Sequence, residues 1–423
     1  MMNARKIAVK ALSDIYKSGA YSNITLKNIF SQIQLSTTDK SFISALFYGV
    51  LDRKITIDCV LKKFLRKPVE KLGVITYAAL QIAIYQIMFM DKTPDSAAVN
   101  ESVNIVKNSR EKYNSSLVNA ILRSYLREGF VIPSENDINS LSIRFSCPEW
   151  IIDSFISDYG IDDTVKFLEN SLIKPPITLR VNTQRTTAEE LLQKLKCENI
   201  NTEIVAENAL SVIGSIDIEN SPSFKKGYFH VQDMASQKSL SVLTPAANER
   251  ILDLCASPGG KTFTMAQMMQ NKGEIFAFDL YPHRVQMIHS GAKRLGLDIV
   301  KSYIGDATVF NDKIGKFNAV LCDVPCSGLG VIRRKPEIKY KENAVDNTIA
   351  DIQLKILDNA TNYLEDNGRI LYSTCTLRKI ENELLIKAFL DKHHEYEVKY
   401  QHTYMPHIDG TDGFYCALLT KSR

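Results

Sequence analysis

The sequence lacks three features that would assign it at once to a class of protein. No run of about 18 apolar residues occurs, which argues against a membrane-spanning helix. The opening stretch, MMNARKIAVKALSDIYKSG, lacks the apolar core of a signal peptide and has the pattern of a helix. The eight cysteines include no CxxC pair, which argues against a disulfide scaffold or a zinc ribbon. We therefore expect reduced thiols, a cytoplasmic location and no bound metal.

Length and charge point to several domains and to a polyanionic partner. At 423 residues the chain exceeds one ordinary hydrophobic core, so two or three domains are expected. The net charge of +4 is unevenly distributed: residues 1–72 hold 13 Lys and Arg against five Asp and Glu, a net +8, which leaves −4 for the rest. A basic N-terminal face favours a partner such as RNA. A lysine-rich helical surface facing water explains the same excess equally well.

The hydrophobic pattern divides the chain into three predicted domains. Residues 1–138 have apolar residues at helical spacing almost throughout and predict an all-α domain. Residues 139–235 mix helical stretches with short strands and predict a small α+β module, which we describe as RRM-like. Across residues 236–423 apolar runs alternate with helical patterns, which predicts a parallel sheet with helices on both faces. Ligands of such sheets bind beyond the carboxyl ends of the strands.

A glycine turn follows the first strand of this third domain. Residues 253–263 read DLCASPGGKTF, in which Gly259 and Gly260 allow close approach of a ligand and the following helix N-terminus favours an anionic group. The turn is neither a GxGxxG fingerprint nor a P-loop. Asp279 ends the next strand, where an acid can bind ribose hydroxyls, and Asp306 follows the third strand, where it can meet an adenine amino group. The alternative for the glycines alone is a turn with helix caps.

Two further strand ends carry thiols. Residues 320–330 read VLCDVPCSGLG and place Asp323 near Cys326, and residues 371–377 read LYSTCTL and contain Cys375. The residues alone leave open which thiol reacts. Arg333, Arg334 and Lys335 follow the first block and have two equally plausible roles, raising the thiolate fraction or holding RNA phosphates.

These blocks carry a family resemblance. LDLCASPGGKT, VLCDVPCSGLGVIRRKPEIKY and LYSTCTLRKIENE resemble the signature blocks of the S-adenosylmethionine-dependent RNA cytosine-C5 methyltransferases, as do LRVNT, VQDMASQ and GTDGFYCALL. PDSAAVNESVNIVK and SSLVNAILR are similar to the NusB-like RNA-binding domain, which is fused to the methyltransferase in the bacterial RsmB (Sun) subgroup acting on 16S ribosomal RNA. The resemblance implies a Rossmann-like class I methyltransferase fold with an all-α NusB-like domain before it.

The resemblance also implies residue roles. A thiolate that adds to C6 of cytosine makes C5 nucleophilic, and loss of the C5 proton later lets the thiol leave. In the family the cysteine of the TC block attacks, which implies Cys375 as nucleophile, Cys326 in product release and Asp323 at the cytosine edge. Lys261 is implied near the catalytic centre, with its role open. The residues implied in cofactor binding are Cys255, Ala256, Ser257, Pro258, Gly259, Gly260, Lys261, Asp279, Arg284, Asp306 and Asp323.

Two alternative functions compete with this interpretation. A DNA cytosine-C5 methyltransferase would use Cys326 and would not need Cys375. A non-catalytic NusB-like RNA-binding or antitermination factor would have a degraded cofactor loop, whereas DLCASPGGK and both cysteines are intact. An oxidoreductase is disfavoured because GxGxxG is absent. We expect S-adenosylmethionine as cofactor, 16S ribosomal RNA as partner, a target base that is flipped out or single-stranded, and a monomer without an obligate protein partner.

Overall fold

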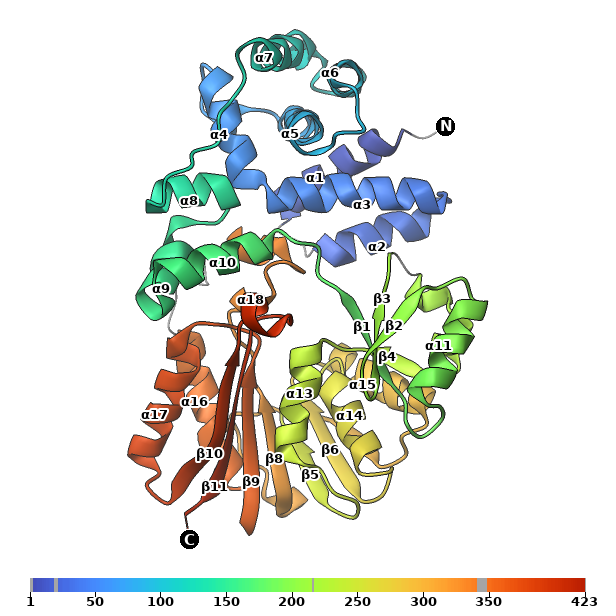
Figure 1. Cartoon of the computed structure of the whole chain (residues 1–423), viewed down its shortest axis with the longest axis vertical. Coiled ribbons are helices and arrows are strands. Elements are labelled where there is room, and N and C mark those ends of the chain that lie inside the picture. The colour runs from blue at the N-terminus through green and yellow to red at the C-terminus, as the bar shows by residue number, and fades with distance from the viewer. Residues whose placement is uncertain (1–2, 19–21, 215–216, 341–347, 423) are drawn as a thin grey trace. The chain divides into compact units, whose positions relative to one another are not determined.

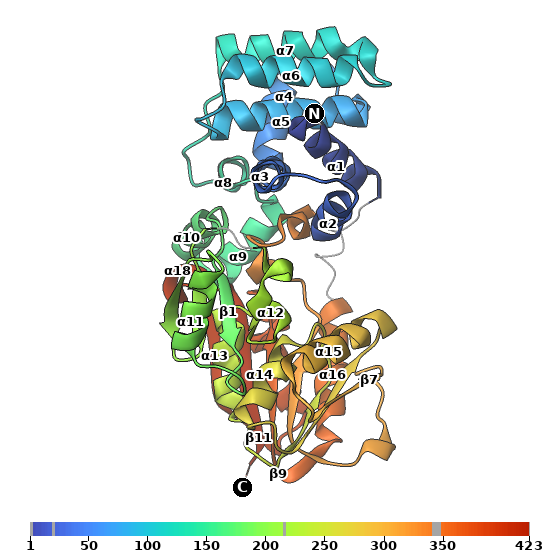
Figure 2. The ribbon, with the colours of Figure 1, turned by 90° about the vertical axis from the view of Figure 1, so that its right-hand side faces the viewer.

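The structure is a computed structural model that describes residues 3–18, 22–214, 217–340 and 348–422. It comprises two compact units, which are described separately here and can be followed in Figures 1 and 2. Unit 1 consists of Met1–Ile173 and Ile332–Glu342, and unit 2 consists of Lys174–Val331 and Asn343–Arg423. In the part of the chain that the structure describes, no helix is long and apolar enough to cross a membrane.

Unit 1 is helical and is organised around α5 (Val74–Phe89). Residues Ala78 to Ile84 of α5 are all fully buried. Seven consecutive residues span nearly two helical turns, so α5 is covered on every side and forms the centre of the core. The other helices of unit 1 are α1 (Ala4–Ser18), α2 (Ser22–Gln32), α3 (Thr37–Asp52), α4 (Lys54–Phe64), α6 (Asp95–Lys107), α7 (Ser115–Glu128), α8 (Ile138–Phe145), α9 (Glu149–Tyr159) and α10 (Ile161–Ser171).

A segment from far along the chain completes unit 1. The short 3-10 helix η6 (Pro336–Tyr340) places Lys339 so that its Nζ donates to the carbonyl oxygens of Asp52 at 3.1 Å and Ser146 at 2.9 Å. The Tyr340 hydroxyl donates to the Leu51 carbonyl oxygen at 2.9 Å. Lys339 is 3% exposed, and burial lowers its pKa. The chain therefore passes from unit 2 into unit 1 just after the block VLCDVPCSGLG.

The two compact units divide the chain differently from the three predicted domains. Helices α8 to α10 lie largely within residues 139–235 but group with unit 1, and residues 332–342 leave the predicted third domain for unit 1. The three-domain division remains a prediction. The α+β character predicted for residues 139–235 is present as α11 (Ala188–Cys197), α12 (Pro222–Lys225) and a four-stranded antiparallel sheet ordered β2-β3-β1-β4, made of β1 (Ile177–Val181), β2 (Thr202–Ala206), β3 (Ala209–Val212) and β4 (Phe229–Val231).

The large sheet of unit 2 has seven strands in the order β10-β11-β9-β8-β5-β6-β7. Its five strands from β9 to β7 are parallel, as predicted, while β11 is antiparallel to both β9 and β10. The strand β10 was not predicted. The strands are β5 (Arg250–Asp253), β6 (Glu274–Asp279), β7 (Val300–Ile304), β8 (Phe317–Asp323), β9 (Leu364–Thr374), β10 (Tyr396–Tyr404) and β11 (Phe414–Lys421).

Alternation along the central strands builds a core on each face of this sheet. Leu321 of β8 packs into one cluster with residues of α13, α14 and α15, and its neighbour Val320 packs into the other with residues of α16 and α17. Successive strand residues point to opposite faces, so a fully covered sheet requires near-continuous apolar strands. Figure 1 shows these helices on the two sides of the sheet. The helices of this unit are α13 (Met234–Leu243), α14 (Gly260–Met268), α15 (Pro282–Leu295), α16 (Thr348–Thr361), α17 (Glu383–Lys392) and α18 (Pro406–Asp409).

Candidate active site

The parallel strands bring the predicted catalytic residues to one edge of the sheet. Asp323 ends β8 and pairs in register with Ser373 of the neighbouring β9, so the segments that carry Cys326 and Cys375 start side by side. The Cys326 and Cys375 sulfur atoms lie 3.2 Å apart. All eight cysteines of the chain are thiols. Two residues 49 positions apart in sequence thus form a thiol–thiol contact, which is the central feature of the site.

Backbone contacts fix the two cysteine segments to each other. The Gly330 N–H donates to the Cys375 carbonyl at 3.0 Å, and the Gly413 N–H donates to the Gly330 carbonyl at 2.9 Å. A Cβ on Gly330 would lie 2.0 Å from the Gly413 carbonyl oxygen and 2.9 Å from that of Cys375. Only glycine permits so close an approach of the two backbones, because any side chain on Gly330 would force the two segments apart.

Lys261 and Asp323 connect the glycine turn to the cysteine segments. Lys261, in the first turn of α14, places its Nζ 2.7 Å from Asp323 Oδ2, and the Ser373 hydroxyl donates to Asp323 Oδ1 at 2.8 Å. Lys261 Nζ also lies 4.9 Å from the centre of the Phe414 ring, within the range of a cation–π contact. Both carboxylate oxygens of Asp323 are held, so its orientation is fixed by the fold.

The two glycines of the turn have different structural requirements. Gly259 has a φ of +109°, and a Cβ there would lie 2.2 Å from the Phe263 ring, so the fold itself requires glycine. Gly260 has no such conformation, and the heavy atoms nearest to a Cβ there, in Gln232, are 3.9 Å away. A glycine that the fold does not require suits a position where a ligand approaches the backbone. The turn begins at Cys255, whose thiol has a pKa raised by burial, and Ala256 is bound through its N–H to Phe278 O at 2.8 Å.

The remaining predicted cofactor residues lie at the ends of β6 and β7. Asp279 Oδ1 accepts from the Tyr281 N–H at 3.1 Å and lies 3.9 Å from Arg284 Nη1. Asp306 Oδ1 accepts from the N–H and hydroxyl of Thr308, and these bonds lower the pKa of Asp306. A cavity of about 250 Å³ opens beside Asp306, and most of its lining is apolar: Leu254, Phe278, Ile304, Val309, Phe310 and Tyr363. The cavity has the apolar walls and single acid that a planar heterocycle requires.

The surroundings of Cys326 favour its neutral thiol form. The pKa of Cys326 is raised well above its ordinary value, chiefly by its hydrogen bond with Cys375, then by burial and by the charge of nearby Glu381.

The basic string Arg333, Arg334 and Lys335 follows the first cysteine block in the sequence. Residues 333–335 belong to unit 1, where Arg333 donates to Asn170 Oδ1 at 3.1 Å, and its effect on the thiols stays a prediction. Among the described residues, no group of three or more His, Cys, Asp and Glu side chains could hold a metal ion.

Several buried polar residues of this site were not predicted from the sequence. Asp253, at the end of β5, is fully buried, and its Oδ2 accepts from the Thr262 hydroxyl at 2.6 Å. Glu381 and Asn382 are also fully buried and contact the cysteine segments. Their signal was present, because both fall within the block LYSTCTLRKIENE, six and seven residues after Cys375. Acids at the start of a helix are usually caps, which conceals such a role.

Asp253 makes a pH-dependent contribution to stability. Burial raises its pKa to about 7, with the nearby Asp323 charge adding to the shift and the Thr262 bond opposing it. The folded chain therefore keeps this proton to higher pH than the unfolded chain, and the associated stability is complete below pH ~4 and lost as pH rises through ~7. We predict that Asp253→Asn removes roughly 4 kcal/mol of this pH dependence in the free energy of unfolding. Urea unfolding of both proteins at several pH values measures it, and parallel stability–pH curves would contradict the assignment.

Comparison with known proteins identifies the family. Residues 240–420 match the family model of the 16S rRNA methyltransferase RsmB/F, residues 2–127 the NusB family, and residues 147–219 the ferredoxin-like domain of RsmF/B-like methyltransferases. The probable ribosomal RNA small subunit methyltransferase B of Bacillus subtilis is 35% identical over 445 residues, which cover 99% of each chain. The chain belongs to the ribosomal RNA small subunit methyltransferase B family.

Two further comparisons agree with this family assignment. The probable ribosomal RNA small subunit methyltransferase B of Synechocystis is 32% identical, with all of both chains covered. The crystal structure of PH0851 superposes with a TM-score of 0.85 at 26% identity and covers 100% of this chain and 99% of its own. The predicted family and the predicted fold class, a Rossmann-like methyltransferase domain with a NusB-type helical domain, are thereby confirmed. The individual site residues remain predictions.

Proposed function

We propose that this rRNA methyltransferase transfers a methyl group from S-adenosylmethionine to C5 of a cytosine in 16S ribosomal RNA. Cys375 is the nucleophile, Cys326 assists release, and Asp323 contacts the cytosine edge. The observation that carries the proposal is the 3.2 Å contact between the two thiols, together with the contacts that Asp323 makes with Lys261 and Ser373. The curated relatives, which are named as small-subunit rRNA methyltransferases, support the substrate class.

The chemistry requires covalent activation because C5 of cytosine is a poor nucleophile. The Cys375 thiolate adds to C6, which forms an S–C6 bond and moves the ring electrons towards C5. After C5 has gained the methyl group, it loses its proton to a base from the solvent. The electron pair of that C–H bond restores the C5–C6 double bond and expels Cys375 as thiolate. The ring thus exchanges one hydrogen for one methyl group and the enzyme is regenerated.

The neighbours of the thiols have distinct tasks in this scheme. Asp323, with its oxygens held by Lys261 and Ser373, is oriented to accept a hydrogen bond from the amino group at the cytosine edge. A fixed acceptor of this kind places the ring in reach of Cys375 without reorganisation during the reaction. A stacked base would hide C6, so the target cytosine is flipped out or lies in a single-stranded loop. We assign the protein to the cytoplasm, where reducing conditions keep its eight cysteines as thiols, and we propose that it acts as a monomer.

The described residues fit S-adenosylmethionine. When bound, it supplies the methyl group as an electrophile. The backbone of residues 255–260 and the N-terminus of α14 would hold its methionine end, Asp279 its ribose hydroxyls, and the cavity beside Asp306 its adenine. Arg284 lies beside Asp279 and would act there through that carboxylate.

The close approach of this cofactor can be tested at Gly260. We predict that Gly260→Ala weakens S-adenosylmethionine binding on the order of tenfold, about 1.4 kcal/mol, because the Cβ would occupy space needed by the ligand. The thermal unfolding midpoint of the protein without ligand should stay the same, since a Cβ there has no protein neighbour within 3.9 Å. Isothermal titration gives the affinity. Unchanged affinity would show that the ligand does not approach this backbone.

The proposed function as a whole is tested by following the C5 hydrogen. Unmodified small-subunit RNA carrying tritium at C5 of its cytosines is incubated with the protein and S-adenosylmethionine. Tritium should enter water in step with transfer of a labelled methyl group to RNA. Methyl transfer without tritium release would place the methyl group on another atom, and the absence of both would refute the enzyme proposal.

A further inference from the structure

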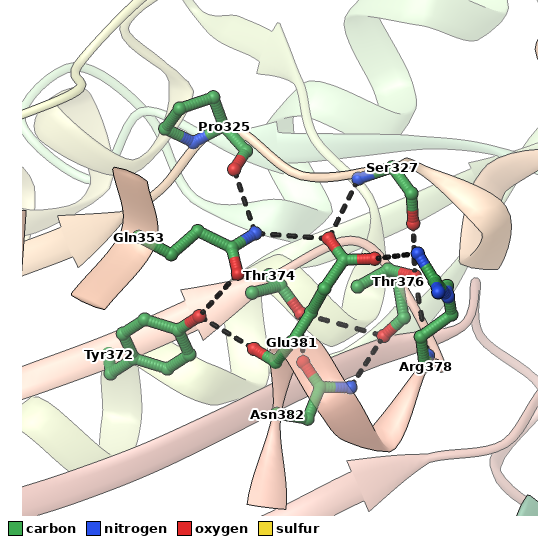
Figure 3. Close-up of polar contacts among 9 residues, drawn as sticks. All are labelled: Pro325, Ser327, Gln353, Tyr372, Thr374, Thr376, Arg378, Glu381 and Asn382. Atoms are coloured by element: carbon green, nitrogen blue, oxygen red, sulfur yellow. Dashed lines mark hydrogen bonds and ion pairs between the residues drawn. The ribbon is translucent and has the colours of Figure 1, made fainter. Parts of the chain in front are cut away.

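A buried Glu–Gln pair holds both flanks of Cys326. Glu381 Oε2 accepts from the Ser327 N–H at 2.9 Å, on one side of the cysteine. Gln353 Nε2 donates to the Pro325 carbonyl at 2.9 Å, on the other side, and to the same Glu381 oxygen at 3.0 Å. Figure 3 shows the Glu381 carboxylate between these groups. Both peptide groups that flank Cys326 are thus tied to one pair of side chains.

Asn382, the residue after Glu381, holds both flanks of Cys375. The Thr374 hydroxyl donates to Asn382 Oδ1 at 2.6 Å, and Asn382 Nδ2 donates to the Thr376 carbonyl at 3.0 Å (Figure 3). The Ser327 and Thr376 hydroxyls, which follow the two cysteines, contact each other at 2.7 Å. Two consecutive residues, Glu381 and Asn382, therefore hold one cysteine segment each.

Glu381 is fixed by contacts beyond those to the Cys326 segment. It is 0% exposed, its Oε1 lies 3.5 Å from Arg378 Nη1, and its carbonyl accepts from the Tyr372 hydroxyl at 2.6 Å. A buried carboxylate is costly unless its hydrogen bonds and charge are compensated. The Glu381 carboxylate contacts the Ser327 N–H, Gln353 Nε2 and Arg378 Nη1. The start of α17 itself needs only an exposed cap, so desolvating a carboxylate there has no benefit for the helix alone.

We propose that Glu381 and Asn382 are positioning residues that set the two thiols against each other and give them separate roles. This inference rests on the proposed function of the thiols. Asn382 holds Cys375 where it can attack, and Glu381 with Gln353 holds Cys326 where it assists release. The Glu381 charge adds to the Cys375 hydrogen bond and to burial, which together raise the pKa of Cys326 and favour its thiol form, while Cys375 supplies the thiolate. Neither residue contacts the reacting base in this account.

The two residues should therefore give different phenotypes. In single-turnover reactions with labelled S-adenosylmethionine and unmodified small-subunit RNA, Asn382→Ala should slow both adduct formation and methyl transfer on the order of 100-fold, because a nucleophile displaced by about 1 Å loses that much. Glu381→Gln, which keeps the shape but removes the charge, should leave methyl transfer within about tenfold and instead accumulate a denaturant-stable protein–RNA adduct. The pH midpoint of adduct release should also move to lower pH in Glu381→Gln, because the charge that raises the Cys326 pKa is gone.

Milder variants and a neighbour serve as controls. Gln353→Met removes side-chain hydrogen bonds that hold the Cys326 segment and should reproduce the release defect. Thr374→Val removes one that holds the Cys375 segment and should reproduce the attack defect. These two variants test the roles even if Glu381→Gln or Asn382→Ala does not fold. Glu383→Gln should behave as wild type, since Glu383 accepts instead from Thr403 in β10. S-adenosylmethionine affinity by isothermal titration should stay within twofold in all variants.

The outcomes separate this inference from the function on which it rests. Equal losses of attack and release in both variants, or wild-type behaviour in both, would overturn the positioning roles. A wild-type protein that neither releases C5 tritium nor methylates RNA would instead refute the proposed function. A wild type that methylates C5 while Glu381→Gln shows neither the adduct nor the pH shift would refute only the role of Glu381.

Discussion

Cys375→Ala is expected to abolish methyl transfer to RNA. Under the proposed function the Cys375 sulfur forms the only covalent bond between enzyme and base, and removal of a catalytic nucleophile lowers rates by on the order of 10⁴-fold or more. Substituting alanine at this half-buried position leaves a small gap, and S-adenosylmethionine affinity should change little. The measurement is transfer of a labelled methyl group to unmodified small-subunit RNA, with a denaturing gel to show that no protein–RNA adduct forms.

This variant also decides between the two thiols. Cys326 lies only 3.2 Å from Cys375 and could replace it as the nucleophile. A DNA-type enzyme would attack through Cys326, and its Cys375→Ala variant would still methylate. Cys322→Ala is a matched control, because that thiol is fully buried within β8, with a pKa raised by burial, and should be dispensable for transfer. Substantial methylation by Cys375→Ala would reverse the assignment.

The strand-end residues could be predicted from the sequence because parallel strands order them. Asp279 and Asp323 end apolar runs, Asp306 follows β7 by two residues, and all parallel strands of a sheet end at the same edge. The antiparallel strand β11 and its neighbour β10 were harder. The β10 sequence YEVKYQHTY is mostly polar and is buried only at its two ends, so it has little of the apolar signal that marks the central strands.

The grouping of helices and the polar network under the thiols could not be predicted in the same way. That α8 to α10 and η6 join unit 1 depends on contacts between distant segments, such as Lys339 with Ser146, and no local pattern encodes such contacts. Glu381 and Gln353 are hydrogen-bonded across 28 residues of sequence. Each has an ordinary helical context when viewed alone, and only their burial beside Pro325 reveals a shared role.

Cys326→Ala is expected to have the opposite phenotype to Cys375→Ala. Attack and methyl transfer need only Cys375, so the variant should methylate its first RNA molecule and then retain it as a denaturant-stable adduct, with multiple turnover reduced on the order of 100-fold. The adduct should carry the labelled methyl group and should disappear in the Cys326→Ala/Cys375→Ala double variant, which shows that Cys375 is its point of attachment. Gel separation in denaturant with labelled RNA and labelled methyl donor measures both. If Cys326→Ala were inactive without an adduct, Cys326 would take part in the attack itself. The 3.2 Å contact between the thiols would then serve to activate Cys375 for attack, and not to release the methylated RNA.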